Sequence, residues 1–367
     1  MVIGKKSRLC SLIEIQLLQK KTSAHATVWN RLTKMIIGKY NTAKEFRGRA
    51  SMNKALLYPT FDHWWFGCAE RVEKLSELRD SYWITLKQSS RLSKNAKVML
   101  FIHGGGFISG HPLGLESQSV MHALNDFNKK HHACSHVLSV NYRLLTEPSE
   151  YDTMDRRLFT DRMGDQVEDC FDCFNYLIHE KKIPASNIVI AGYSAGAALS
   201  MLLVLKRLLK NYKENEDSNM YWPVHSVSLY SVPGDISDTI VVPNLEEIAR
   251  NTLVLSSELL DVIHRCVPKD DLIPFSVACN LEEMKKDENF AKQLFMTKWA
   301  INYSNHEELT PGNEYLVKEL EILKKQVPSA SLLVVTEDHQ MHCYTAAYGW
   351  LPEARRSMFL MLEQALK

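Results

Sequence analysis

Short apolar runs alternate with helical patterns along most of the chain. The runs at 97–103 and 187–193 are apolar at most positions, which is typical of strands covered on both faces. Further strands are predicted at 82–86, 137–142, 224–230, 296–303 and 331–336. Helices are predicted at 165–181, 195–212, 244–266, 313–325 and 352–366. This alternation predicts an α/β fold with a mostly parallel sheet and helices on both faces.

The segments between these elements predict one domain, 1–367, with added cap pieces. The polar stretch 146–164 is expected to be a surface loop, and 267–290 is expected to be irregular. Residues 236–290 are therefore interpreted as a cap inserted over the sheet, together with about 1–74. The run of aromatic residues at 61–66 either walls an apolar pocket or packs the N-terminal helices on the core.

The N-terminal region is basic and amphipathic. Residues 1–55 contain twelve Lys/Arg and two Glu, and their apolar positions at 9–17 and 28–36 fall near helical spacing. Ser11, Glu14 and Gln16 interrupt the first apolar stretch, so a retained helix is favoured over a cleaved signal peptide. Such a helix suits either a cap that packs on the domain or peripheral contact with an anionic membrane. The expected location is cytoplasmic or peripheral to the endoplasmic reticulum, and not secreted.

Composition excludes several other classes. The 367 residues are 45% hydrophobic and 24% charged with a net charge of +1, so no global attraction to nucleic acid is expected. No apolar run reaches the roughly 18 residues of a membrane span. The eight cysteines are scattered, which favours a reducing compartment. We interpret the Cys170/Cys173 pair as small residues on a helix face and His131, His132 and His136 as a polar loop, so no metal is predicted.

The strongest chemical signal is Gly192-Tyr193-Ser194-Ala195-Gly196, between an apolar strand and a helix. In the G-x-S-x-G pattern the serine occupies a strained turn that exposes its hydroxyl. The positions two before and two after the serine crowd each other, and glycine suits both. Ser194 is therefore a candidate nucleophile.

A second signal is the triple glycine Gly104-Gly105-Gly106, which follows the strand 97–103. Consecutive glycines lose much backbone entropy when the chain folds. We therefore expect the missing side chains to serve a function, which is to let a ligand approach the backbone closely. Exposed N–H groups at this place could hold a developing negative charge.

Two more strand ends contain acids and histidines, at 305–309 and 339–342. The carboxyl ends of parallel strands gather at one edge of a sheet, where ligands bind. A serine nucleophile needs a neighbouring base, and the base needs a carboxylate to fix its tautomer. The order serine, acid, histidine along this chain is therefore consistent with a catalytic triad.

Taken together, HGGGF, NYRL, GYSAG, SVPGDIS and a late His-Cys-Tyr resemble the hormone-sensitive-lipase-like branch of the α/β-hydrolases. The N-terminal helices and the glutamate-type acid are most similar to fungal steryl acetyl hydrolases. The resemblance covers roughly residues 60–367. It implies Ser194 as nucleophile, His342 as base, and the amides of Gly105, Gly106 and Ala195 as the oxyanion hole.

The acid is less sharply defined by the resemblance. The family pattern of Asp or Glu, any residue, then Leu fits Glu307, with Glu308 as the alternative. Asp338 is too close to the histidine turn to be preferred, and His339 competes with His342. The chain departs from the family at Tyr193, at Ala197 and after NYRL, but no departure removes a catalytic group.

The function predicted from these features is hydrolysis of a carboxylic ester of a hydrophobic alcohol, with steryl acetates as the specific substrate hypothesis. The expected partner is a small-molecule ester, and no metal or organic cofactor is implied. Two alternatives remain open at this point: a non-catalytic binding protein on the same fold, and an amide hydrolase that cleaves formamides. The sequence carries no signal for oligomeric state.

Overall fold

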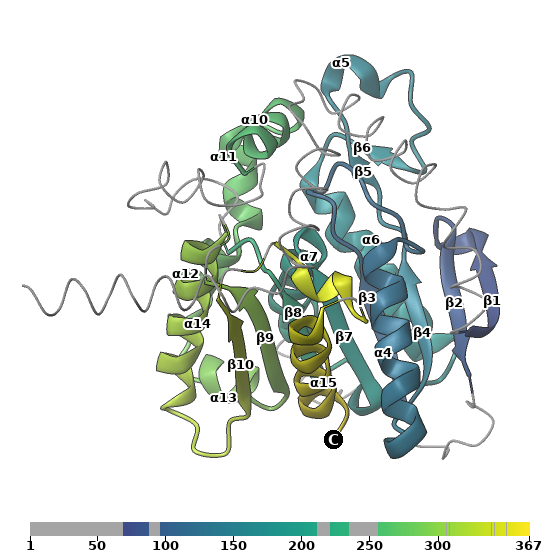
Figure 1. The fold of residues 1–367 in the computed structure, drawn as a ribbon. Coiled ribbons are helices and arrows are strands. Elements are labelled where there is room, and N and C mark those ends of the chain that lie inside the picture. Colours follow the sequence, from purple (N-terminus) through teal and green to yellow (C-terminus); the bar gives the residue numbers. More distant parts are fainter. Residues whose placement is uncertain are drawn as a thin grey trace, which may run out of the picture.

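An eight-stranded sheet forms the centre of the molecule in this computed structural model (Figure 1). The structure describes residues 69–87, 96–210, 221–234, 256–305, 307, 309–338, 340, 342–349 and 351–367. In spatial order the strands are β1 (Ala69–Leu75), β2 (Ser81–Leu86), β4 (Cys134–Val140), β3 (Lys97–Ile102), β7 (Ile188–Tyr193), β8 (Ser226–Tyr230), β9 (Lys298–Ser304) and β10 (Leu332–Glu337). Only the pairs β1–β2 and β2–β4 are antiparallel within this sheet, so the predicted mostly parallel architecture is confirmed.

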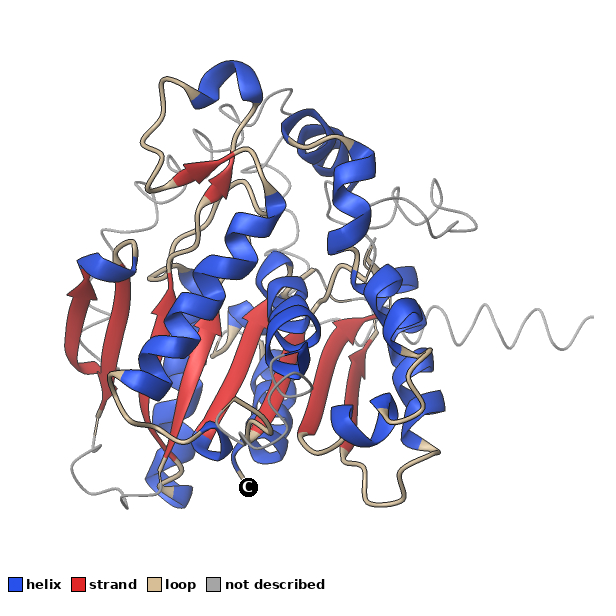
Figure 2. Ribbon diagram, turned by 180° about the vertical axis from the view of Figure 1, so that it is seen from behind, coloured by secondary structure: helices blue, strands red, loops and turns tan. Residues whose placement is uncertain are grey.

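Helices cover both faces of the sheet (Figure 2). The alternation of side chains along β3 shows the division, since Leu100 and Ile102 face one apolar cluster and Met99 and Phe101 face the other. The first face is covered by α6 (Met163–His179), α7 (Ala195–Leu203) and α14 (Thr310–Lys324). The second face is covered by α4 (Leu115–His131) and α15 (Pro352–Leu366).

A smaller layer lies beyond the carboxyl ends of the parallel strands (Figure 1). It contains α5 (Pro148–Tyr151), the two-residue strands β5 (Leu144–Leu145) and β6 (Phe159–Thr160), and the helices α10 (Ser256–Cys266) and α11 (Lys269–Leu272). Next along the chain come the short helices α12 (Val277–Met284) and α13 (Phe290–Leu294), and α13 lies at the opposite end of the sheet (Figure 1). Lys206, in the π-helical turn Val204–Leu208 that extends α7, donates to Pro274 O at 2.9 Å and ties this layer to the first face.

Several expectations about irregular segments are wrong. Residues 267–290 contain α11 and α12, and the expected loop at 146–164 contains α5 and β6. His131 ends α4, and His136 lies within β4 with its ring stacked on Trp83, so these residues are not a polar loop. Short amphipathic helices in the cap carry too few turns for their periodicity to stand out. The predicted elements before residue 69, including the aromatic run at 61–66, lie outside the described residues.

Cys170 and Cys173 are both buried on α6, as the packing interpretation requires. Burial raises the pKa of the Cys173 thiol to about 12, so this thiol is neutral at physiological pH. Across the described ranges, no cluster of three or more His, Cys, Asp or Glu side chains could hold a metal ion. No described helix is long and apolar enough to cross a membrane.

Candidate active site

Ser194 lies at the turn between β7 and α7 in a strained backbone conformation, with φ 48° and ψ −119°. A Cβ atom on Gly192 would lie 2.3 Å from Gly196 O. A Cβ atom on Gly196 would lie 2.1 Å from Ile102 O at the end of β3. The predicted crowding is therefore present, and it also involves the neighbouring strand. Glycine at both positions lets the turn close and presents the serine hydroxyl at the carboxyl edge of the sheet.

Ser194, His342 and Glu307 form one hydrogen-bonded series. The distance from His342 Nε2 to Ser194 Oγ is 2.8 Å, and from His342 Nδ1 to Glu307 Oε2 it is 2.9 Å. A proton on Nδ1 donates to the carboxylate, which leaves Nε2 able to accept from the serine hydroxyl. Residues separated by up to 148 positions thus meet in the geometry that activates a serine.

Glu307 is held firmly in this arrangement. Its side chain is fully buried, its N–H donates to Thr310 Oγ1 at 3.0 Å, and Asn313 Nδ2 donates to its Oε1 at 3.3 Å. Among the other predicted candidates, Asp338 accepts from Asn305 on the exposed side of the same strand ends. Glu308 and His339 lie outside the described residues. The structure therefore brings Glu307, and not Asp338, to the histidine.

The surroundings of His342 favour its charged form. Burial opposes protonation of the ring, but the Glu307 carboxylate on Nδ1 outweighs it and raises the pKa of His342 well above the ordinary 6.5. A carboxylate that stabilises the imidazolium is the role that an acid has beside a catalytic base.

The glycine turn after β3 lies beside the serine. Gly105 and Gly106 adopt φ values of 113° and 61°, which glycine reaches without a steric penalty. Within the described part of the chain, no protein acceptor is bonded to the N–H groups of Gly105, Gly106 or Ala195. These three amides, predicted as oxyanion donors, are therefore free to bind a ligand atom.

Two side chains that the sequence did not reveal as functional, Tyr142 and His103, fix the direction of the glycine turn. Tyr142 OH donates to His103 O at 3.0 Å and to Gly104 O at 3.3 Å, and His103 Nδ1 lies 2.7 Å from Gly104 O. In a planar trans peptide the C=O and the following N–H point in opposite directions. Holding Gly104 O therefore directs the Gly105 N–H away from the protein core. The NYRL pattern was the available signal for Tyr142, although it did not reveal this contact.

Tyr193 is one of the positions at which the chain departs from the family pattern. Its ring is fully buried and stacks on Tyr230 with centroids 4.5 Å apart and an interplanar angle of 5°. The side chain fills the core below the turn, which explains why the substitution leaves the serine turn intact.

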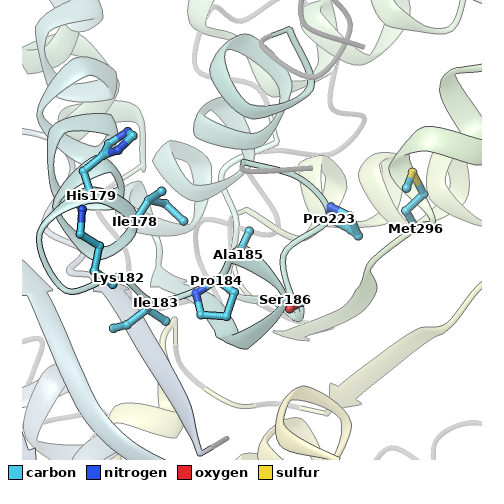
Figure 3. A pocket seen from close by; sticks show the side chains of 9 residues that line it. All are labelled: Ile178, His179, Lys182, Ile183, Pro184, Ala185, Ser186, Pro223 and Met296. Atoms are coloured by element: carbon cyan, nitrogen blue, oxygen red, sulfur yellow. The ribbon is translucent and has the colours of Figure 1, made fainter. Parts of the chain in front are cut away.

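A separate groove of about 600 Å³ lies at the opposite end of the sheet (Figure 3). Pro184 and Ser186 precede β7, and Pro223 and Met296 precede β8 and β9, so the groove is at the amino ends of the strands. In open α/β sheets ligands bind at the carboxyl ends. We therefore place the functional site at Ser194 and not in this groove.

Comparison with known proteins identifies the fold. The family model described as BD-FAE matches residues 84–239. A search of curated protein sequences found no match. An esterase/lipase from an uncultured bacterium superposes with a TM-score of 0.64 at 16% identity, covering 94% of this chain and 100% of its own.

Two further structures give the same result. The monoclinic form of the Pyrobaculum calidifontis esterase has a TM-score of 0.64 at 16% identity, over 93% of this chain and 99% of its own. The hormone-sensitive-lipase homologue EstE7 from a metagenome library has a TM-score of 0.60 at 18% identity, over 92% of this chain and 96% of its own. The chain therefore has the α/β-hydrolase fold of these esterases.

Proposed function

We propose that this protein is a serine hydrolase that cleaves carboxylic esters. The observation that carries the proposal is the series Ser194–His342–Glu307, with distances of 2.8 Å and 2.9 Å, beside three amides that have no protein acceptor among the described residues. Nucleophile, base, orienting acid and oxyanion donors are the complete set of groups that acyl transfer requires.

The proposed reaction has two halves. Ser194 Oγ attacks the acyl carbon and its proton passes to His342 Nε2, while the carbonyl oxygen becomes anionic and accepts from Gly105, Gly106 and Ala195. The ester C–O bond then breaks, and the alcohol leaves with the proton from His342. Water attacks the acyl-serine and gives its proton to His342, which returns a proton to Ser194 as the carboxylic acid departs.

For the substrate, we propose an ester of a hydrophobic alcohol, with a steryl acetate as the specific candidate. The sequence resemblance to steryl acetyl hydrolases supports this choice, as does the helical layer over the carboxyl edge of the sheet. Rates on p-nitrophenyl acetate, butyrate and laurate, together with cholesteryl acetate, would test it. Preference for acetyl over longer chains and cleavage of cholesteryl acetate are expected. Faster cleavage of laurate and no attack on the steryl ester would contradict the substrate proposal alone.

The activity itself is tested with a fluorophosphonate probe on the full chain. We expect the probe to label the wild type and the Ser186→Ala variant equally, because Ser186 is exposed at the opposite end of the sheet. Labelling and p-nitrophenyl acetate hydrolysis should both be lost in Ser194→Ala. Equal labelling of the Ser194→Ala variant, or no labelling of the wild type, would contradict an acyl-serine mechanism.

A further inference from the structure

Glu116 is a second carboxylate beside the proposed site, and neither the motifs nor the triad accounts for it. It lies in the first turn of α4, twelve residues after Gly104 in sequence. Its Oε2 accepts from the Gly104 N–H at 2.8 Å. A methyl group placed on Gly104 would lie 2.7 Å from Glu116 Oε1 and 3.2 Å from Ser194 Cβ, so the carboxylate and the nucleophile flank the same glycine.

The Glu116 contact adds a second anchor to the peptide group between His103 and Gly104. Tyr142 OH binds the carbonyl of the His103–Gly104 peptide, and Glu116 binds its N–H. Both ends of that peptide plane are thereby anchored, and the following peptide, which carries the Gly105 N–H, begins from a fixed position. Loss of either anchor would allow the oxyanion donors to rotate.

Several ionisable side chains surround Glu116, and one of them, His342, can carry the opposite charge. The ionisable groups that face it within the described residues are His342, Cys343, Tyr142 and Tyr193. Burial raises the pKa of the Cys343 thiol and of both tyrosines, so these groups are neutral at pH 7. Burial also raises the pKa of Glu116, whereas the Gly104 N–H and His342 oppose this shift, as does the start of a helix. Glu307 is the ionised group that acts on His342 through a hydrogen bond, and the attraction between His342 and Glu116 lowers the pKa of Glu116.

We propose that Glu116 is a positioning residue that anchors the oxyanion turn through Gly104 and, as a second carboxylate beside Ser194, supports the imidazolium form of His342. The proposal rests on the proposed hydrolase function for its kinetic part. Anchoring and charge are separable, because glutamine keeps a carbonyl acceptor for the Gly104 N–H but has no charge. Alanine removes both.

The experiment compares Glu116→Gln and Glu116→Ala with the wild type. For Glu116→Gln we expect kcat to fall about tenfold with KM unchanged, since a nearby charge no longer stabilises the imidazolium in the transition state. The pKa of His342 should fall, which moves the acid limb of kcat/KM to lower pH. For Glu116→Ala we expect kcat to fall by roughly 10- to 100-fold, because the donors lose their orientation.

A matched control is Glu353→Gln, another glutamate in the first turn of a helix, α15. It should leave kcat and the pKa of His342 unchanged. Thermal unfolding of all variants identifies a variant that loses activity only because it unfolds.

The pKa of His342 is also measured by NMR titration of the imidazole Cε1–H, assigned with His342→Asn, and this readout does not depend on turnover. An unchanged His342 pKa in Glu116→Gln would overturn the charge role, and wild-type kcat in Glu116→Ala would overturn the anchoring role. A wild type that hydrolyses no ester would contradict the proposed function, while the titration would still decide the electrostatic part.

Discussion

At the scale of single residues, Glu307 has the best-defined contacts of the Ser194–His342–Glu307 series. Glu307 is completely buried, and both carboxylate oxygens have partners, His342 on Oε2 and Asn313 on Oε1. A buried carboxylate with these contacts keeps the histidine in one tautomer and stabilises its positive charge. The proposed roles of Ser194 and His342 therefore depend on Glu307.

Glu307→Gln tests that dependence. We expect kcat to fall by about 10²- to 10⁴-fold, because the amide can hold the wrong histidine tautomer and carries no charge. The sign of the pH effect follows from His342, whose pKa is raised above 6.5 with help from Glu307. The base works only when neutral, so wild-type activity should rise with pH through this raised pKa. In Glu307→Gln the pKa should be lower, and the acid limb should move to lower pH.

A pH profile of kcat/KM on p-nitrophenyl acetate measures both effects. Asp338→Asn is the matched control, because Asp338 follows the neighbouring strand β10 but accepts from Asn305 and not from the histidine. A Glu307→Gln enzyme with wild-type kcat would assign the acid to another residue.

At the scale of elements, the sequence predicted best where patterns are long or fully apolar. The helix at 352–366 matches α15 at both ends, and every predicted strand is present within a few residues. The sequence did not predict α4, in which polar residues interrupt the apolar face, or the short cap helices. Ser194 and the glycine turn were predictable because turn chemistry is local. The contacts of Glu116 and Tyr142 were not, since they depend on how α4 and the end of β4 lie against β3.

One element-level contact explains part of the NYRL segment. Arg143, just after β4, binds the buried Asp169 of α6 through Nη2 at 2.8 Å, and Arg79 Nε reaches the same carboxylate at 3.0 Å. Asp169→Ala would remove the buried carboxylate that both arginines share, while Arg143 keeps Asp165 and Arg79 keeps Asp172. We expect the free energy of unfolding to fall by about 2–3 kcal/mol, as for the loss of hydrogen bonds to a charged group.

Asp172→Ala is the control on the same helix. Its carboxylate also binds Arg79, at 3.2 Å, but is 47% exposed, so its loss should cost no more than about 1 kcal/mol. Urea unfolding followed by circular dichroism measures both variants. Equal destabilisation by the two substitutions would show that burial of the ion pair does not matter.

At the scale of the whole molecule, charge is distributed unevenly along a chain whose net charge is only +1. Residues 1–55 contain twelve Lys/Arg and two Glu, whereas residues 56–367 contain 32 Lys/Arg and 41 Asp/Glu. A basic segment attached to an acidic remainder is attracted to anionic lipid, while the remainder is repelled by it. We therefore propose that the first 55 residues bring the protein to anionic membrane surfaces, where esters of hydrophobic alcohols partition.

Vesicle co-sedimentation of the full chain tests this proposal. We expect binding to phosphatidylcholine vesicles that contain phosphatidylserine, little binding to phosphatidylcholine alone, and release by salt, because charges farther apart than about 8 Å are screened at physiological ionic strength. Each basic residue near the membrane surface contributes about 1 kcal/mol to binding. Replacing five of them by glutamine should therefore weaken binding by more than about tenfold. The replaced residues are Lys5, Lys6, Arg8, Lys20 and Lys21. The control replaces five exposed lysines of the described surface, Lys130, Lys286, Lys292, Lys318 and Lys325. If the two variants bind equally, the net charge of the protein and not its N-terminal segment governs the attraction, and the proposal fails.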